Sequence, residues 1–97
     1  MKAVMIIYNQ ALTEKLEYML AKLNIRGFSR FPDVMGAGTT TGNPHMGTHT
    51  WPEMNSATLT VVQDTQVDLL LEKIQKLDAI NTDVGIRAFV WNIEKMC

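Results

Sequence analysis

The sequence predicts an α+β fold in which one four-stranded antiparallel sheet carries two helices on a single face. Patterned segments follow one another as strand, helix, strand, strand, helix, strand. Short connections and right-handed crossovers arrange that order as a ferredoxin-like βαββαβ sandwich. A long unpatterned segment, residues 35–54, separates the second and third strands. We therefore expect residues 1–97 to form one domain whose only long loop lies between strands 2 and 3.

The first three elements follow from apolar spacing and from local start and stop signals. The aliphatic run Lys2–Tyr8 predicts a strand that is buried on both faces. Thr13 is a candidate N-cap for the first helix, which carries an apolar stripe at helical spacing. Asn24 is a candidate helix stop, because asparagine tolerates the left-handed conformation that ends many helices. A second strand is expected from Gly27 to about Val34.

The last three elements are predicted in the same way. Residues Asn55–Val62 alternate between apolar and threonine side chains, which is typical of a strand with one buried face. The second helix is expected to begin at Asp64 or Thr65, where Thr65 and the acid three residues later resemble a capping box. A turn over Asp78–Val84 then leads to a last strand, Ile86–Glu94.

One sheet face is predicted to remain open, because both helices cover the other. Phe31, Phe89 and Trp91 are too apolar for a surface in contact with water, so we expect this face to pack against another subunit.

Composition excludes several classes of protein. The formal net charge of −1 argues against a nucleic-acid binder, which needs a basic excess on one face. The single cysteine, Cys97, cannot form an internal disulfide and indicates a reducing compartment. No signal-peptide pattern begins the chain, and no apolar run reaches the ~20 residues that cross a bilayer. We therefore expect a cytoplasmic protein that does not insert into a membrane. No spacing typical of a Ser-His-acid or Cys-His site is present, so we do not expect an enzyme.

The loop of residues 35–54 is the expected functional region. It holds four of the six glycines and both histidines, and it contains no lysine or arginine. Loops of this length in compact domains are uncommon and are usually functional or disordered.

Several motifs resemble those of the PII-like signalling superfamily, which includes nitrogen-regulatory PII and the CutA proteins. Residues 34–38, VMGAG, resemble the V-K-G-x-G segment that opens the effector loop of PII. Residues 61–68, VVQDTQVD, resemble the family's third strand and second helix, and residues 87–93, RAFVWNI, resemble its last strand. Residues 47–56, GTHTWPEMNS, are similar to the G-x-x-x-W-P-x-x-N-S signature of a divergent PII-like group.

The resemblance implies a homotrimer that binds a small effector, such as an adenine nucleotide, in clefts between subunits. It also implies that residues 35–54 switch conformation and dock a protein partner, either a membrane transporter or an enzyme. The chain departs from the PII pattern in several places; for example, residues 35–54 hold no counterpart of PII's modified loop tyrosine. Residues 81–86, NTDVGI, replace the glycine-rich segment before the last strand, with Arg87 in the lysine's place, and Thr39 and Thr40 replace an arginine-or-glutamine pair.

Candidate effector-binding residues lie around the loop. Gly36 and Gly38 would let backbone amides approach a phosphate, although both could equally be hinge residues. Thr39 could add a hydroxyl donor. Arg87 and Arg30 each offer a planar guanidinium to a phosphate or carboxylate; the alternative for Arg87 is an ion pair with an acid such as Asp83.

Three further loop residues leave alternatives open. Trp51 either anchors the loop on the sheet or stacks on the base of a ligand. His45 and His49 could share a transition metal, although a stable site needs more ligands than two. The alternative function is therefore a divalent or copper metal-binding protein of the CutA-like or metal-efflux-associated type. A third alternative is an oligomerisation module that grips a protein partner without a small ligand.

Overall fold

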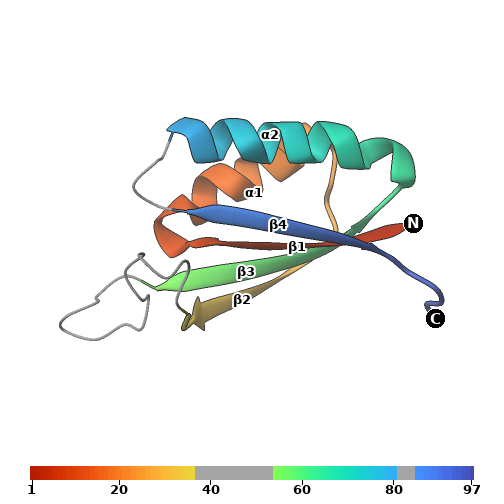
Figure 1. Cartoon of the computed structure of the whole chain (residues 1–97), viewed down its shortest axis with the longest axis horizontal. Coiled ribbons are helices and arrows are strands. Elements are labelled where there is room, and N and C mark those ends of the chain that lie inside the picture. Colours follow the sequence, from red (N-terminus) through yellow and green to blue (C-terminus); the bar gives the residue numbers. More distant parts are fainter. Residues whose placement is uncertain (37–53, 81–84) are drawn as a thin grey trace.

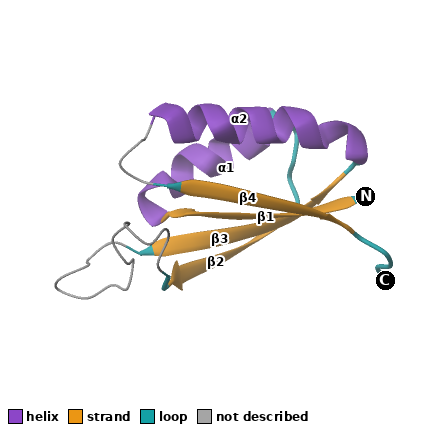
Figure 2. Ribbon diagram, viewed as in Figure 1, coloured by secondary structure: helices purple, strands orange, loops and turns teal. Residues whose placement is uncertain are grey.

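A computed structural model describes residues 1–36, 54–80 and 85–97 and confirms the predicted ferredoxin-like fold. Four strands form one sheet in the order β2-β3-β1-β4, and each neighbouring pair is antiparallel. Both α-helices cover the same face of this sheet (Figures 1 and 2). The elements are β1 (Lys2–Asn9), η1 (Gln10–Leu12), α1 (Thr13–Lys22), β2 (Phe28–Val34), β3 (Asn55–Val62), η2 (Asp64–Gln66), α2 (Val67–Ile80) and β4 (Ile86–Asn92).

The hydrophobic core lies between the sheet and the two helices. Alternate residues of β1 point into it, and Val4, Ile6 and Tyr8 are completely buried. The helices contribute fully buried leucines such as Leu16 and Leu70 from their inner faces. Each strand of the sheet therefore has one face toward this core and one face away from the helices, and the register of the pairs assigns every side chain to one of them.

The structure shows which face of the alternating strand β3 meets the helices, a point that the sequence left open. The threonines face the core, since Thr58 and Thr60 stand opposite Ile6 and Val4 of β1 and are almost completely buried. The apolar residues between them face the open side. The buried hydroxyls find partners: Thr58 Oγ1 lies 2.8 Å from the Tyr8 Oη, and Thr60 Oγ1 donates to the Gly27 carbonyl at 2.6 Å. Hydrogen bonding makes these polar side chains acceptable in the core.

The local signals at the helix ends are partly different from those predicted. Asn24 adopts the predicted left-handed conformation, with φ of 60°, and follows the end of α1. Thr13, however, is not an N-cap, because it lies inside the helical turn and its Oγ1 donates to the Gln10 carbonyl at 2.7 Å. The cap belongs one turn earlier, where the Asn9 side chain accepts from the Ala11 amide at 2.9 Å. The preceding 3₁₀ turn thus takes over the role that the sequence assigned to Thr13.

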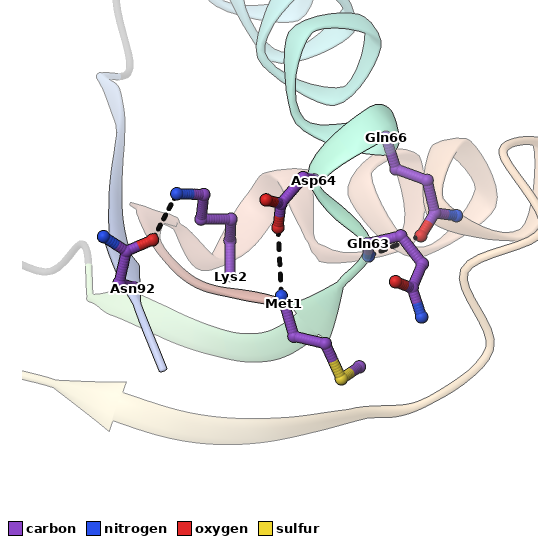
Figure 3. Close-up of polar contacts among 6 residues, drawn as sticks. All are labelled: Met1, Lys2, Gln63, Asp64, Gln66 and Asn92. Carbon is purple, nitrogen blue, oxygen red and sulfur yellow. Dashed lines mark hydrogen bonds and ion pairs between the residues drawn. The ribbon is translucent and has the colours of Figure 1, made fainter. Parts of the chain in front are cut away.

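The second helix also begins and ends differently from the prediction. A 3₁₀ turn, η2, precedes α2, and the Gln63 amide donates to the Gln66 Oε1 at 2.9 Å (Figure 3). This pair takes the reciprocal capping role that Thr65 and Asp68 were expected to have. At the other end α2 continues through Ile80, so residues 78–80 are helical rather than part of a turn. The last strand ends at Asn92, two residues earlier than expected.

An ion pair ties the start of β1 to the start of the second helix. The α-ammonium group of Met1 lies 3.0 Å from the Asp64 Oδ1, and the Lys2 ammonium donates to the Asn92 side chain on β4 (Figure 3). The hydrogen bond from the α-ammonium group, with its positive charge, lowers the pKa of Asp64. No helix in the described part of the chain is both long and apolar enough to cross a membrane.

Candidate functional site

The site begins where residues 35–54 leave the sheet and return to it. Val34 at the end of β2 pairs with Asn55 at the start of β3, so the two ends of the loop lie side by side. The returning end is also attached to η1, because the Gln10 amide donates to the Met54 carbonyl at 2.9 Å. The fold therefore presents both ends of the loop at one end of the sheet (Figure 1).

Gly36 is not required by the packing of its own chain. A Cβ atom built on it meets no atom of the described residues within 4 Å, and its φ lies outside the left-handed region that favours glycine. The chain would therefore tolerate a side chain at this position. Gly36 is half-buried at the base of the loop, and the space beside its Cα atom leaves room for a ligand or for another copy of the chain.

Arg87 lies at the same end of the sheet but at its opposite edge, on β4. It stands opposite Ile7 of β1, whose side chain points away from the core, so Arg87 also faces the open side. Its Nη1 donates to the Ile86 carbonyl at 3.3 Å, and the residue is exposed. Two strands lie between β2 and β4, so the two edge strands are roughly 14 Å apart at a strand spacing of about 4.8 Å. Gly36, beyond the end of β2, and Arg87, near the start of β4, are separated by at least that width of sheet.

Asp78 positions the start of β4, a role that the sequence did not reveal. Its Oδ1 accepts the Ile86 amide at 3.0 Å, next to Arg87 in the chain. This contact joins the last turn of α2 to the first residue of the strand. The interaction was missed because residue 78 was expected in a turn. In a turn, no sequence pattern distinguishes an acid that accepts a backbone hydrogen bond from an acid that only contacts water.

Arg30 lies on the other face of the sheet from Arg87. It stands opposite the buried Thr58, and its Nε is 3.4 Å from the Glu17 Oε2 on α1. The two predicted arginines therefore do not meet within one chain.

The remaining predicted site residues lie outside the described residues. They are Gly38, Thr39, His45, His49 and Trp51. Among residues 1–36, 54–80 and 85–97, no three His, Cys, Asp or Glu side chains come together as they would around a metal ion. The histidine metal site thus stays a prediction.

The open face of the sheet is apolar, as predicted. Phe31, Phe89 and Trp91 remain 48%, 52% and 48% exposed, which is a large fraction for aromatic side chains of a folded chain. Because the threonines of β3 face the core, Leu59 and Val61 lie on this open face as well. The sequence analysis did not assign these two residues to the open face.

Comparison with known proteins identifies the fold family. The family model described as nitrogen regulatory protein P-II matches residues 1–97. A PII-like signalling protein from Thermus thermophilus is 18% identical with a TM-score of 0.67, covering 95% of this chain and 85% of that one. The nitrogen regulatory PII-like protein CPII from Thiomonas intermedia, in a structure bound to ADP and bicarbonate, is 17% identical with a TM-score of 0.73, covering 97% and 88%. Its apo form is 16% identical with a TM-score of 0.68, covering 95% and 89%. No curated protein matched the chain.

Proposed function

Because this chain belongs to the nitrogen regulatory protein P-II family, we propose that it is a non-enzymatic regulator that binds an adenine nucleotide between the subunits of a homotrimer. The nucleotide would order residues 35–54, and the ordered loop would dock a membrane transporter or an enzyme. The observation that carries this proposal is the placement of Gly36 and Arg87 at one end of the sheet but at opposite edges.

The apolar open face supports self-association. Three aromatic side chains from β2 and β4 are about half exposed there, together with apolar residues of β1 and β3. A monomer would leave this surface in water, and burying it against further copies would be favourable at about 25 cal/mol per Å² of apolar surface. The resemblance to the PII-like superfamily supports three as the number of copies.

The opposite-edge placement supports a binding site between copies. A compact ligand cannot contact Gly36 and Arg87 of one chain when two strands lie between them, but association can bring Gly36 of one copy near Arg87 of the next. Backbone amides beside Gly36 and Gly38 would then face a phosphate that the guanidinium also binds. Thr39 would add a hydroxyl donor and Trp51 a surface for the base. CPII complexes with ADP, and with ADP and AMP, support an adenine nucleotide as the effector class.

The switching step needs a ligand that binds one loop state better than another. A ligand shifts a conformational equilibrium only by its difference in affinity for the two states. A site built partly from the base of the loop meets this condition, because the loop contributes the binding atoms directly. Docking of a partner then depends on the nucleotide without any chemical step.

Native mass spectrometry with ADP tests the proposal. The wild type is expected to be a trimer that takes up to three nucleotides. Arg87→Gln should weaken ADP binding about tenfold or more, since a hydrogen bond to a charged group is lost. Gly36→Val should also weaken it while leaving each chain folded, because a Cβ at this position meets no neighbour among residues 1–36, 54–80 and 85–97.

Arg26→Gln is the matched control. It removes the same charge from an exposed arginine whose Nε donates to the Asn24 side chain at 3.1 Å, away from the proposed cleft. ADP binding should be unchanged in this variant. A wild-type trimer that ignores ADP but binds copper or zinc would overturn the proposal in favour of the His45 and His49 metal site. A monomer, or equal ADP binding by Arg87→Gln, would also contradict it.

A further inference from the structure

A pocket of about 380 Å³ lies within a single chain, on the helix side of the sheet. It opens between the start of α1 and the C-terminal part of β2, so it is separate from the open face that carries Arg87. Its volume reaches the lower part of the roughly 300–1,000 Å³ range of small-molecule sites, and the pocket is shallow and open to solvent on one side. Its polar walls are Gln10, Thr13, Glu14, Arg30, Asp33 and Ser56.

Arg30 lines this pocket, and its guanidinium has donors to spare. Among the described residues, its partner is Glu17, whose buried Oε2 lies 3.4 Å from the Arg30 Nε and has no hydrogen bond there. This ion pair restrains the side chain beside α1. Arginine carries five N–H donors, and no other partner of Arg30 is found in the described part of the chain. Its two terminal nitrogens can therefore bind a carboxylate through paired hydrogen bonds.

Two carboxylates face the same pocket. Glu14 comes from the first turn of α1, and Asp33 comes from an irregular part of β2, where the register shifts between Phe31 and Val34. Asp33 has a φ of 59°, which is uncommon for a residue other than glycine. Strand irregularities of this kind redirect side chains and are frequent beside functional sites. The bulge thus brings an acidic side chain into the wall of the pocket that also contains Arg30.

The combination of charges selects a class of ligand. A simple anion would bind Arg30 but would be repelled by Glu14, Asp33 and the Glu17 carboxylate that already pairs with Arg30. A simple amine would be attracted by the carboxylates but would leave the terminal nitrogens of Arg30 without an acceptor. We propose that the pocket binds a small zwitterion of the α-amino acid class, with its carboxylate on Arg30 and its ammonium group between Asp33 and Glu14. Such a ligand satisfies all three groups at once. Because the pocket lies within one chain, the proposal does not depend on the trimer or on nucleotide binding.

The position of the pocket gives the ligand a route to the loop. Asp33 is two residues from Met35, where the loop of residues 35–54 begins. An ammonium group bound by Asp33 would hold the irregular part of β2 in one conformation. The amino acid would then act as a second input on the segment that the nucleotide is proposed to order.

Titration of the ¹⁵N-labelled protein with L-alanine tests this proposal. Saturable shifts of the amide signals of Gln10, Asp33 and Ser56 are expected. Propionate and ethylamine, which each retain one of the two charged groups, should bind at least tenfold more weakly at the same ionic strength. Equal binding of either compound would overturn the zwitterion assignment, and the absence of saturable shifts with L-alanine would overturn the site.

Two variants and one control localise the binding. Arg30→Gln and Asp33→Asn should each weaken L-alanine binding about tenfold or more, because each removes a charged hydrogen-bonding partner. Arg26→Gln removes an exposed charge from the connection between α1 and β2 and should bind L-alanine as the wild type does. Asp33→Asn keeps a residue type that tolerates positive φ, so it separates loss of binding from loss of folding. Unchanged binding in both pocket variants would contradict the proposal, and ADP binding measured on the same samples reports separately on the cleft between subunits.

Discussion

The buried pair of Tyr8 and Thr58 gives a quantitative test of how this core is built. Their side-chain oxygens are 2.8 Å apart, and both residues are completely buried between the sheet and the helices. Tyr8→Phe removes one hydroxyl and leaves the other in the core without its partner. An orphaned buried polar group costs about 1–3 kcal/mol, so the free energy of unfolding should fall by that amount. Thr58→Val removes the opposite hydroxyl at nearly constant shape and should cost about the same.

The double variant separates the hydrogen bond from the packing. When both hydroxyls are absent, neither polar group is orphaned, and replacing both partners by apolar groups of the same shape can be nearly neutral. Tyr8→Phe with Thr58→Val should therefore destabilise the protein by less than the sum of the single changes. The difference should be about 1 kcal/mol or more, because contacting residues couple.

Urea unfolding at one fixed protein concentration measures these values, since self-association would otherwise make stability depend on concentration. Thr65→Val is the matched control: it makes the same chemical change at an exposed position on η2 and should shift stability by no more than about 0.5 kcal/mol. Additive effects of the two core changes, or single changes as small as the control, would refute the inferred role of the buried pair.

Three other predictions concern the ends and the open face of the sheet. The α-ammonium group of Met1 lowers the pKa of Asp64 below its ordinary value of 3.8. The Asp64 carboxylate therefore stabilises the fold above pH 3.8 and loses that effect as the pH falls through the lowered pKa. Asp64→Asn should make the midpoint of urea unfolding less sensitive to acid. Asp78→Ala removes the acceptor of the Ile86 amide and should lower the free energy of unfolding by about 1–2 kcal/mol in urea titrations. Trp91→Glu places a charge on the apolar open face and should dissociate the proposed trimer, as measured by sedimentation.

Each of these three predictions has an outcome that would contradict it. Identical acid sensitivity in the wild type and in Asp64→Asn would show that the ion pair with the chain end is not populated in solution. For the helix-to-strand contact, Gln75→Ala at an exposed site of α2 is the control, and equal losses would remove the special role of Asp78. For the open face, Leu69→Glu adds the same charge to an exposed apolar position on α2 and should leave the assembly intact. Dissociation by both variants would point to a general charge effect.

The order of elements was predictable because it depends on local spacing. The helical stripes that contain Leu16 and Leu70 bury those residues completely. Asn24 ends the first helix through a conformation that its own side chain permits. The apolar open face was also predictable, because Phe89 and Trp91 share one side of a strand whose other side packs on the helices.

The sequence of β3 alone could not show which of its two faces meets the helices. Alternation shows that the two faces of a strand differ, but it does not say which face meets the helices. That depends on partners far away in the chain: Thr58 is accepted in the core by Tyr8, and Thr60 by the Gly27 carbonyl. The contact of Asp78 with the start of β4 and the pocket around Arg30 were missed for the same reason, since each forms only when separate elements come together.

The orientation of β3, with its threonines toward the core and its apolar residues toward the open side, bears directly on how the protein would function. Had Leu59 and Val61 faced the core, Thr58 and Thr60 would have lain on the open side and separated the apolar residues of β1 from those of β2. As the strand lies, Leu59 stands between Ser29 of β2 and Met5 of β1, with Phe89 beyond Met5 on β4. The next β3 residue on this face, Ala57, stands opposite Phe31 of β2, so apolar side chains from all four strands adjoin on the open side. A continuous apolar surface of this kind marks an interaction site. The polar residues that β3 places in the core thus leave its apolar residues for the open face, where they support the association that a nucleotide site between copies requires.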